Sequence, residues 1–254
     1  MLLQPYLKAA SKSPLWVADH YEPKQDPVSL VCSNQLMLEI FVPLSRHTVF
    51  YQPTKDQQLI ASIRQDLSER EDVIIDYGKL GRDKLSNLSF ATGSVLEPPF
   101  EPGTFDNVYF DLGEMGTRNS RGFGWREPWQ NSLIALAEYV EKLKSGGHLF
   151  SRVPIASAAA ADYVTDVVSR LVEQYAGSEV EQKEVLKSEY KGDFVYDLMI
   201  KVRKKTHIDA KAIRERTKQE DFELDMPEFP IGVPDLSTNT VLVTTDADLE
   251  ARLN

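Results

Sequence analysis

One long loop gathers residue types that bind anions and anchor protein interfaces. The segment Gly113–Trp129 carries four glycines, three arginines and two tryptophans. Arg118, Arg121 and Arg126 can bind an anion or stack on a base, because a guanidinium is planar and always charged. Trp125 lies among them, and tryptophan and arginine are the commonest interface anchors. We expect this loop to contact a protein partner or an anion; a flexible lid is the alternative.

Three further side chains have types that do chemistry. Asp111 lies at the end of an apolar run, where it can orient a substrate or take up a proton, or else cap the following loop. Cys32 is the only cysteine, so no internal disulfide can form, and its apolar setting favours packing over a nucleophilic role. His148 has no matching Ser or Cys, so a structural role is expected. The four histidines are scattered, and we expect no metal site.

Composition limits the classes of function. Hydrophobic residues make up 42% and charged residues 27%, which is typical of a soluble globular protein. The first residues show no secretory signal and the reduced cysteine fits a reducing compartment, so we expect a cytoplasmic protein without a membrane partner. The net charge is −10, of which residues 206–254 carry −6. Without a basic stripe, the chain is a poor candidate for binding nucleic acid.

Strand patterns alternate with helix patterns along the chain, which predicts parallel crossovers and a doubly wound α/β fold. A mostly parallel sheet of about seven strands is expected, with an antiparallel last strand from the hairpin 184–190 and 194–203. The other predicted strands are 28–32, 48–51, 73–75, 88–91, 105–112 and 148–153. The predicted helices are 36–44, 55–71, 129–143, 156–175 and 208–220. We divide the chain into a domain over 1–205 and a helix with an extended acidic tail over 206–254.

Three segments resemble the class I, Rossmann-like superfamily of S-adenosylmethionine-dependent methyltransferases. These are FATGSVLEPPFEPGTFDNVYFDLG, LAEYVEKLKSGGHLFSRVP and the terminal hairpin EVLKSEYKGDFVYDLMIKVRKK. By the order of elements the resemblance spans roughly residues 1–205, and it is sharp over 90–154. It implies a ligand crevice at the carboxyl ends of the parallel strands.

The resemblance also implies where the cofactor would be held, and this sequence departs from the pattern there. The loop after the first strand is Ser33-Asn34-Gln35, without the expected glycines. Gln52 replaces the acid that takes the ribose, and Ser94 replaces the acid near the adenine. A glutamine can hydrogen-bond the ribose but adds no charge. We therefore expect a degenerate site in which Ser33, Asn34, Gln35 and Gln52 crowd the pocket and no cofactor binds at micromolar concentration.

The acidic tail is rich in prolines and large apolar side chains. Prolines at 227, 230 and 234 favour an extended chain, while Phe229 and Val241 are candidate anchors. We expect residues 221–254 to form an extended arm that docks on a neighbouring subunit or another protein; the alternative is that this segment folds back across its own domain.

Two functions follow from these patterns. The first is a non-catalytic binding or structural subunit of a protein assembly, built on a methyltransferase fold with an eroded cofactor loop and no cofactor. The alternative is an active S-adenosylmethionine-dependent methyltransferase with a divergent loop, in which Asp111 serves the substrate. A decoy of nucleic acid is a weaker third hypothesis, because the first 205 residues carry a net charge of only −4.

Overall fold

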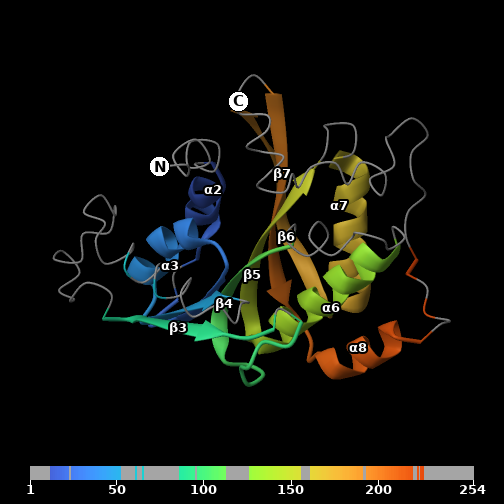
Figure 1. Cartoon of the computed structure of the whole chain (residues 1–254), viewed down its shortest axis with the longest axis horizontal. Helices are drawn as coiled ribbons and strands as arrows, with labels where there is room; N and C mark the ends of the chain where they lie inside the picture. The colour runs from blue at the N-terminus through green and yellow to red at the C-terminus, as the bar shows by residue number, and fades with distance from the viewer. Residues whose placement is uncertain are drawn as a thin grey trace.

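A seven-stranded sheet organises the described part of the chain (Figure 1). The computed structural model describes residues 12–22, 24–52, 86–94, 96–112, 126–155, 161–190 and 193–219, and the single residues 61, 65, 222, 224 and 225. The strands are β1 (Val28–Cys32), β2 (His47–Gln52), β3 (Leu88–Thr92), β4 (Phe105–Asp111), β5 (Leu143–Ile155), β6 (Ser178–Tyr190) and β7 (Asp193–Lys204). Their order across the sheet is β3-β2-β1-β4-β5-β7-β6.

The pairing confirms the predicted doubly wound sheet. Strands β1 to β5 pair in parallel, whereas β7 runs antiparallel to both β5 and β6. The run beginning at Phe105 is β4, which lies between β1 and β5 in the middle of the sheet. Strand β1 pairs with β2, the next strand in the chain, on one side and with β4 on the other side. The strand order therefore reverses between β1 and β4, and this reversal is the topological switch point.

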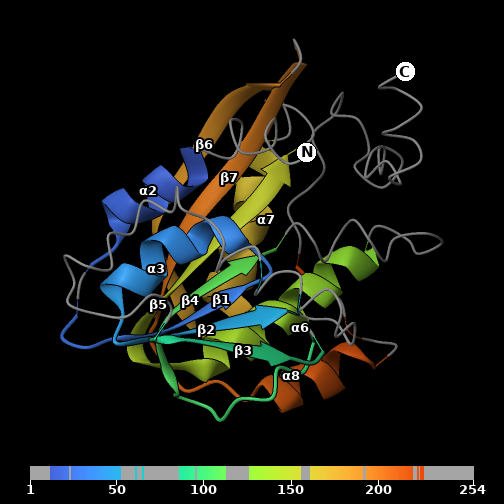
Figure 2. The same ribbon diagram turned by 60° about the vertical axis from the view of Figure 1, so that its left-hand side comes forward.

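Helices cover the two faces of the sheet, as Figures 1 and 2 show. On one face lie α2 (Lys12–His20), a 3-10 turn (η1, Gln35–Met37) and α3 (Leu38–Leu44); on the other lie α6 (Arg126–Lys142), α7 (Ala161–Arg170) with the π-turn η3 (Leu171–Tyr175), and α8 (Ala210–Thr217). Side chains of a strand alternate between faces. Val31 and Tyr109 accordingly pack with α2 and α3, and Leu30 and Phe110 pack with α6 and α7. Among the described residues, no helix combines the length and apolar character needed to cross a membrane.

Several predicted boundaries differ from the structure, and the largest differences are the starts of β5 and β6, which come five and six residues earlier than predicted. Helix α6 ends at Lys142, one residue before its predicted end, and the Nζ atom of Lys204 donates to the carbonyl oxygens of Glu141 and Leu143 there. Gly146 has a left-handed conformation, φ +69°, within β5, between Leu143 and His148, where the register with β4 shifts. Strand β6 begins at 178, six residues before the predicted start. It is an edge strand, and its polar residues hide the strand pattern.

Helix α8 and the described residues beside it pack onto the domain that contains the sheet. Asp209 caps α8 by accepting from the backbone N–H of Ala212 at 2.9 Å. Ile208, Ala210 and Phe222 are buried in the same core as α6. Of the predicted arm 221–254, only residues 222, 224 and 225 are described, so the choice between an arm and a fold-back stays a prediction. The remaining tail, with Phe229 and Val241, lies outside the described residues, as do the predicted strand 73–75 and nearly all of the predicted helix 55–71. The boundary at residue 205 stays a prediction.

Candidate functional site

The carboxyl ends of β1 to β4 meet at one edge of the sheet. Ser33 and Asn34 follow β1, Gln52 ends β2, Ser94 follows β3 and Asp111 ends β4. The structure thus brings together the five polar residues that the sequence places at strand ends. Asp111 is 4% exposed, whereas the other four are half-buried or exposed. In an open parallel sheet, ligands bind at this edge beside the switch point.

The loop after β1 keeps a left-handed turn without a glycine. Ser33 has φ +62°, a conformation that costs a residue with a Cβ about 1–2 kcal/mol. Its backbone N–H donates to the carbonyl oxygen of Tyr51 in β2 at 2.9 Å, which secures the turn against the neighbouring strand. The absence of glycine has therefore not removed the left-handed turn of this loop.

Asn34 connects this loop to β4 across the switch point. Its Oδ1 atom accepts from the N–H of Leu36 at 3.1 Å, and its carbonyl accepts from the N–H of Met37 at 3.2 Å. Its own N–H donates to the carbonyl of Cys32 at 2.8 Å, and its Nδ2 atom donates to the Tyr109 hydroxyl at 3.4 Å. These N–H groups already donate to protein atoms, so they are engaged where a bound ligand would meet the loop.

The end of β3 packs tightly against β2. The Tyr51 hydroxyl donates to the carbonyl oxygen of Ser94 at 2.7 Å, and a Cβ placed on Gly93 would lie 2.6 Å from that hydroxyl. Burial raises the pKa of Tyr51 well above its usual value, so the phenol stays protonated and remains a donor. The Ser94 Oγ atom accepts from the N–H of Leu96 at 3.2 Å, which leaves its own hydroxyl hydrogen able to donate to a ligand.

Three charged side chains converge beside the end of β4. Arg152 of β5 contacts Asp111 twice, from Nη2 to Oδ2 at 3.0 Å and from Nε to Oδ1 at 3.4 Å. Its Nε atom also lies 4.0 Å from Oδ1 of Asp197 in β7. Asp197 is 8% exposed, and burial raises its pKa although the Arg152 charge acts in the opposite direction. Two buried carboxylates thus share one guanidinium at the ligand-binding edge.

Sequence reasoning missed Arg152 and Asp197. Both lie inside predicted strands, and their approach depends on the registers that pair Asp111 with Arg152 and place Asp197 beside Pro154. The available signal was a charge within an otherwise apolar strand, in FSRVP and in VYDLMI. A buried charge in a strand at the carboxyl edge of a sheet is a candidate for function.

Comparisons with solved structures agree with this topology. A structure described as an S-adenosylmethionine-dependent methyltransferase from Methanosarcina mazei aligns with 75% of this chain and 97% of its own, at 11% identity and a TM-score of 0.50. The YcgJ protein from Bacillus subtilis aligns over 77% and 99%, at 12% identity and a TM-score of 0.50. The chain has the class I methyltransferase fold.

The comparisons establish the fold and leave the reaction open. The [4+2]-cyclase SpnF aligns over 78% of this chain and 82% of its own, at 15% identity and a TM-score of 0.54. No family model matches the chain, and no curated protein matches it. Structures with this fold are thus described with different activities, a methyltransferase and a cyclase, so the chemistry must be argued from the site. Neither the non-catalytic role nor the expected absence of a cofactor gains support from the comparisons, which show the fold alone.

The residues at the edge fit one part of S-adenosylmethionine better than the other. Half-buried or exposed amide and hydroxyl groups of Asn34, Gln52 and Ser94 can hydrogen-bond a ribose and an adenine. The methionine part has fewer partners, because the loop N–H groups of Ser33, Asn34, Leu36 and Met37 donate within the protein. S-adenosylmethionine is thus compatible with the residues at this end of the sheet, with contacts weaker than an acid-bearing site provides.

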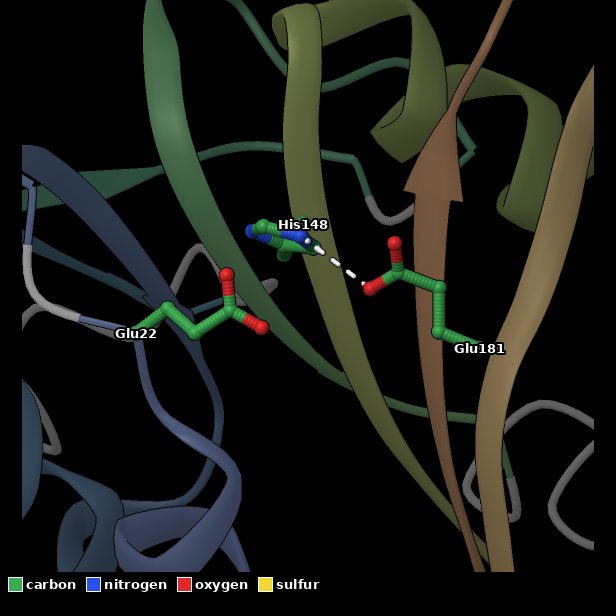
Figure 3. A group of neighbouring side chains, drawn as sticks. All are labelled: Glu22, His148 and Glu181. Atoms are coloured by element: carbon green, nitrogen blue, oxygen red, sulfur yellow. Dashed lines mark ion pairs between the residues drawn. The ribbon is translucent and has the colours of Figure 1, made fainter.

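A second group of charged side chains lies toward the other end of the strands, away from the carboxyl ends of β1 to β4. Figure 3 shows three side chains that point toward one another: Glu22 from the loop after α2, His148 from β5 and Glu181 from β6. The atoms with which they could bind a metal ion lie within 4.8 Å of one another. The Lys201 ammonium already lies between the carboxylates, 2.5 Å from Glu22 Oε1 and 3.5 Å from Glu181 Oε2. Burial and the Lys201 charge lower the pKa of His148. We interpret this group as an ion-pair network in which Lys201 takes the place of a metal.

The remaining predicted residues are placed as follows. Arg118, Arg121, Trp125, Phe229 and Val241 lie outside the described residues. Arg126 begins α6, but its side chain is not among those described, and the same holds for Gln35 in η1. The Cys32 thiol is buried 3.3 Å from the Tyr139 hydroxyl, in the core position that its apolar setting predicts.

Proposed function

We propose that the protein binds S-adenosylmethionine at the carboxyl ends of β1 to β4 and transfers its methyl group to an acceptor bound beside Asp111. When bound, the cofactor supplies an activated methyl group on a sulfonium. The protein's task is to hold the donor and the acceptor in line, and such positioning accounts for much of the catalysis in reactions of this kind.

The ion pair between the buried Asp111 and the half-buried Arg152 carries the proposal. Taking such charges out of water costs several kcal/mol per ion, and apolar residues of similar volume often stabilise a fold as well or better. Here the charges lie at the edge where a ligand binds, beside the end of β4, and Asp197 joins them with a raised pKa. Perturbed charges in such a position are typical of functional sites.

The cofactor's adenosine part would be held by Asn34, Gln52 and Ser94. A neutral hydrogen bond is about half as strong as one to a charged group. The loss of about 1.4 kcal/mol at Gln52 corresponds to about a tenfold weaker affinity than with an acid. We therefore expect binding that is detectable but weaker than at an acid-bearing site.

Isothermal titration calorimetry with S-adenosylhomocysteine tests the proposal. The wild-type protein should bind one equivalent, and Gln52→Ala should bind more weakly. Asp111→Asn should keep that affinity but slow the formation of S-adenosylhomocysteine from S-adenosylmethionine in the presence of cell-extract fractions. Glu184→Gln, which removes an equal charge from an exposed position on β6, is the matched control. Absence of heat with the wild-type protein would contradict the proposal.

The engaged loop favours a second candidate function. The side chain of Asn34 connects the loop after β1 to Tyr109 of β4, and the N–H groups of this loop donate to protein atoms. These groups therefore stabilise the fold and are not free to bind a ligand. A non-catalytic subunit that binds a protein partner through the 113–129 loop and the tail would need no cofactor. This candidate predicts no binding of S-adenosylhomocysteine and loss of assembly when Arg118, Arg121 and Arg126 are replaced together by alanine.

A further inference from the structure

We propose that Arg214 of α8 is a positioning residue of the ligand-binding edge: it fixes the turn after β3 and thereby orients the Ser94 hydroxyl for the adenosine part of the cofactor. The inference rests on the proposed function for the identity of the ligand. It adds the helix α8 to the groups that determine how tightly that ligand binds. The turn after β3 contains the described residues Ser94, Leu96 and Glu97.

Hydrogen bonds within the turn determine where the Ser94 hydroxyl points. Ser94 and Glu97 form an isolated antiparallel bridge, in which the N–H of Glu97 donates to the Ser94 carbonyl at 3.3 Å. The N–H of Leu96 donates to Ser94 Oγ at 3.2 Å. Because that N–H takes one side of Oγ, a shift of the Leu96 backbone reorients the hydroxyl. A bond from Ser94 to a ligand therefore depends on the position of Leu96.

Arg214 holds Leu96 from the side of α8. Its Nη2 atom donates to the Leu96 carbonyl oxygen at 2.9 Å, and its Nη1 atom lies 3.3 Å from Oε1 of Glu97. Tyr51 of β2 holds the beginning of the turn, because its hydroxyl donates to the Ser94 carbonyl at 2.7 Å. The turn is thus fixed from the sheet at one end and from α8 at the other.

The guanidinium is itself fixed, so it can support the turn. The Arg214 side chain is 17% exposed, and its Nη2 atom also pairs with Oε1 of Glu138, a buried carboxylate of α6. Helix α8 lies against α6 in both views (Figures 1 and 2). At the start of α8, the N–H of Ala210 donates to Oε1 of Glu141 in α6 at 3.1 Å. The contact with the turn therefore comes from a packed pair of helices.

The choice of arginine fits positioning better than charge neutralisation alone. Glu138 has a second cation beside it, since Nζ of Lys142 lies 3.8 Å from its Oε2 atom. A guanidinium adds a second nitrogen and a fixed direction, and Arg214 uses both at Leu96 and Glu97. If this support were removed, the Ser94 hydroxyl would lose its fixed direction. Loss of one neutral hydrogen bond corresponds to about threefold to tenfold weaker binding.

Amide hydrogen exchange of the full-length protein tests the support without any ligand. Arg214→Gln should raise the exchange rates at Leu96 and Glu97 and leave those of the central strands unchanged, because only the turn loses a contact. Lys218→Gln removes the same charge from the exposed end of α8 and should leave all these rates unchanged. Equal rates at Leu96 and Glu97 in the wild type and Arg214→Gln would overturn the inference.

Calorimetry with S-adenosylhomocysteine separates positioning from general stability. Arg214→Gln should bind this ligand about threefold to tenfold more weakly than the wild type. Lys204→Met is the matched control, because it removes a buried ammonium that donates to the carbonyls of Glu141 and Leu143 at the end of α6. It should lower the melting temperature and keep the wild-type affinity. Arg214→Lys restores a cation beside Glu138 and should recover the melting temperature more fully than the affinity. An affinity that follows the melting temperature through all three variants would overturn the inference.

The two experiments distinguish this inference from the proposed function. If S-adenosylhomocysteine binds the wild type, and Arg214→Gln changes neither the exchange rates nor the affinity, the role of Arg214 is wrong and the proposed function stands. If S-adenosylhomocysteine does not bind the wild type, and Arg214→Gln raises the exchange rates at Leu96 and Glu97, the proposed function is wrong and the support of the turn by Arg214 stands.

Discussion

Replacing Gly93 with alanine perturbs the tightest contact at the ligand-binding edge. A Cβ at this position would lie 2.6 Å from the Tyr51 hydroxyl and 3.2 Å from Cδ of Pro99. Tyr51 has no exposed surface, and its ring packs edge-on against Phe100 at a centroid distance of 5.4 Å. The phenol therefore cannot swing into solvent to make room, so the backbone or the hydroxyl must move.

The expected cost has two parts. Moving the hydroxyl breaks its 2.7 Å bond to the Ser94 carbonyl, and a buried group left without a partner costs about 1–3 kcal/mol. Overpacking adds about 1–3 kcal/mol, while an alanine in place of glycine returns about 0.4–1 kcal/mol through the unfolded chain. We expect Gly93→Ala to lower the free energy of unfolding by about 2–5 kcal/mol, and the melting temperature by about 5–15 °C.

Urea unfolding of four proteins measures this effect. The wild type, Gly93→Ala, Tyr51→Phe and the double variant form a cycle, in which removal of the hydroxyl should relieve the Gly93→Ala defect. Gly103→Ala is the control for backbone strain, because Gly103 has φ +70° and no atom within 4 Å of its added Cβ. A Gly93→Ala protein within about 0.5 kcal/mol of the wild type, or a double variant with no relief, would refute the reasoning.

Three further predictions follow from the site and the opposite edge. Gln52→Glu should bind S-adenosylhomocysteine about tenfold more tightly in calorimetry, because the ribose bond gains a charge; unchanged affinity would contradict the assignment of this position. Arg152→Met should cost about 3–5 kcal/mol in urea unfolding, because it removes the guanidinium that lies between two buried carboxylates. Lys144→Met, which removes the half-exposed partner of Asp106, should cost about 0–1 kcal/mol, and equal effects of the two variants would contradict this reasoning. The pKa of His148 in the native state lies below its usual 6.5, so the native state binds fewer protons than the unfolded state. The free energy of unfolding should therefore fall as the pH drops from 7 through 6.5 toward that lower pKa. His148→Gln should flatten this fall, and an unaltered pH profile would show that His148 does not cause it.

The fold could be predicted because its signals are local. Apolar runs such as 28–32 and 105–112 alternate with helix periods, and that alternation implies parallel crossovers and a common edge for the strand ends. Ser33, Gln52, Ser94 and Asp111 could be placed at this edge because each ends a strand or follows one. The prediction missed the first six residues of β6, because an edge strand exposes polar residues that obscure the alternation of apolar and polar side chains.

The charged parts of the site depend on register, which local patterns do not reveal. Arg152 approaches Asp111 and Asp197 only through the pairing of β5 with β4 and β7. Glu22, His148 and Glu181 meet from three distant segments, with no characteristic spacing in the sequence. The bridge from Asn34 to Tyr109 likewise requires the side-by-side placement of β1 and β4. A one-residue slip of a strand would reverse the face of each such side chain.

Amide chemical-shift mapping during a titration with S-adenosylhomocysteine tests the central claim most directly, because it shows both whether the ligand binds and where. We predict saturable shifts at Ser33, Asn34, Gln52 and Ser94, at the carboxyl ends of β1 to β3, with His148 and Glu181 at the opposite edge unaffected. Shifts confined to the opposite edge, or no saturable shifts at all, would contradict the claim.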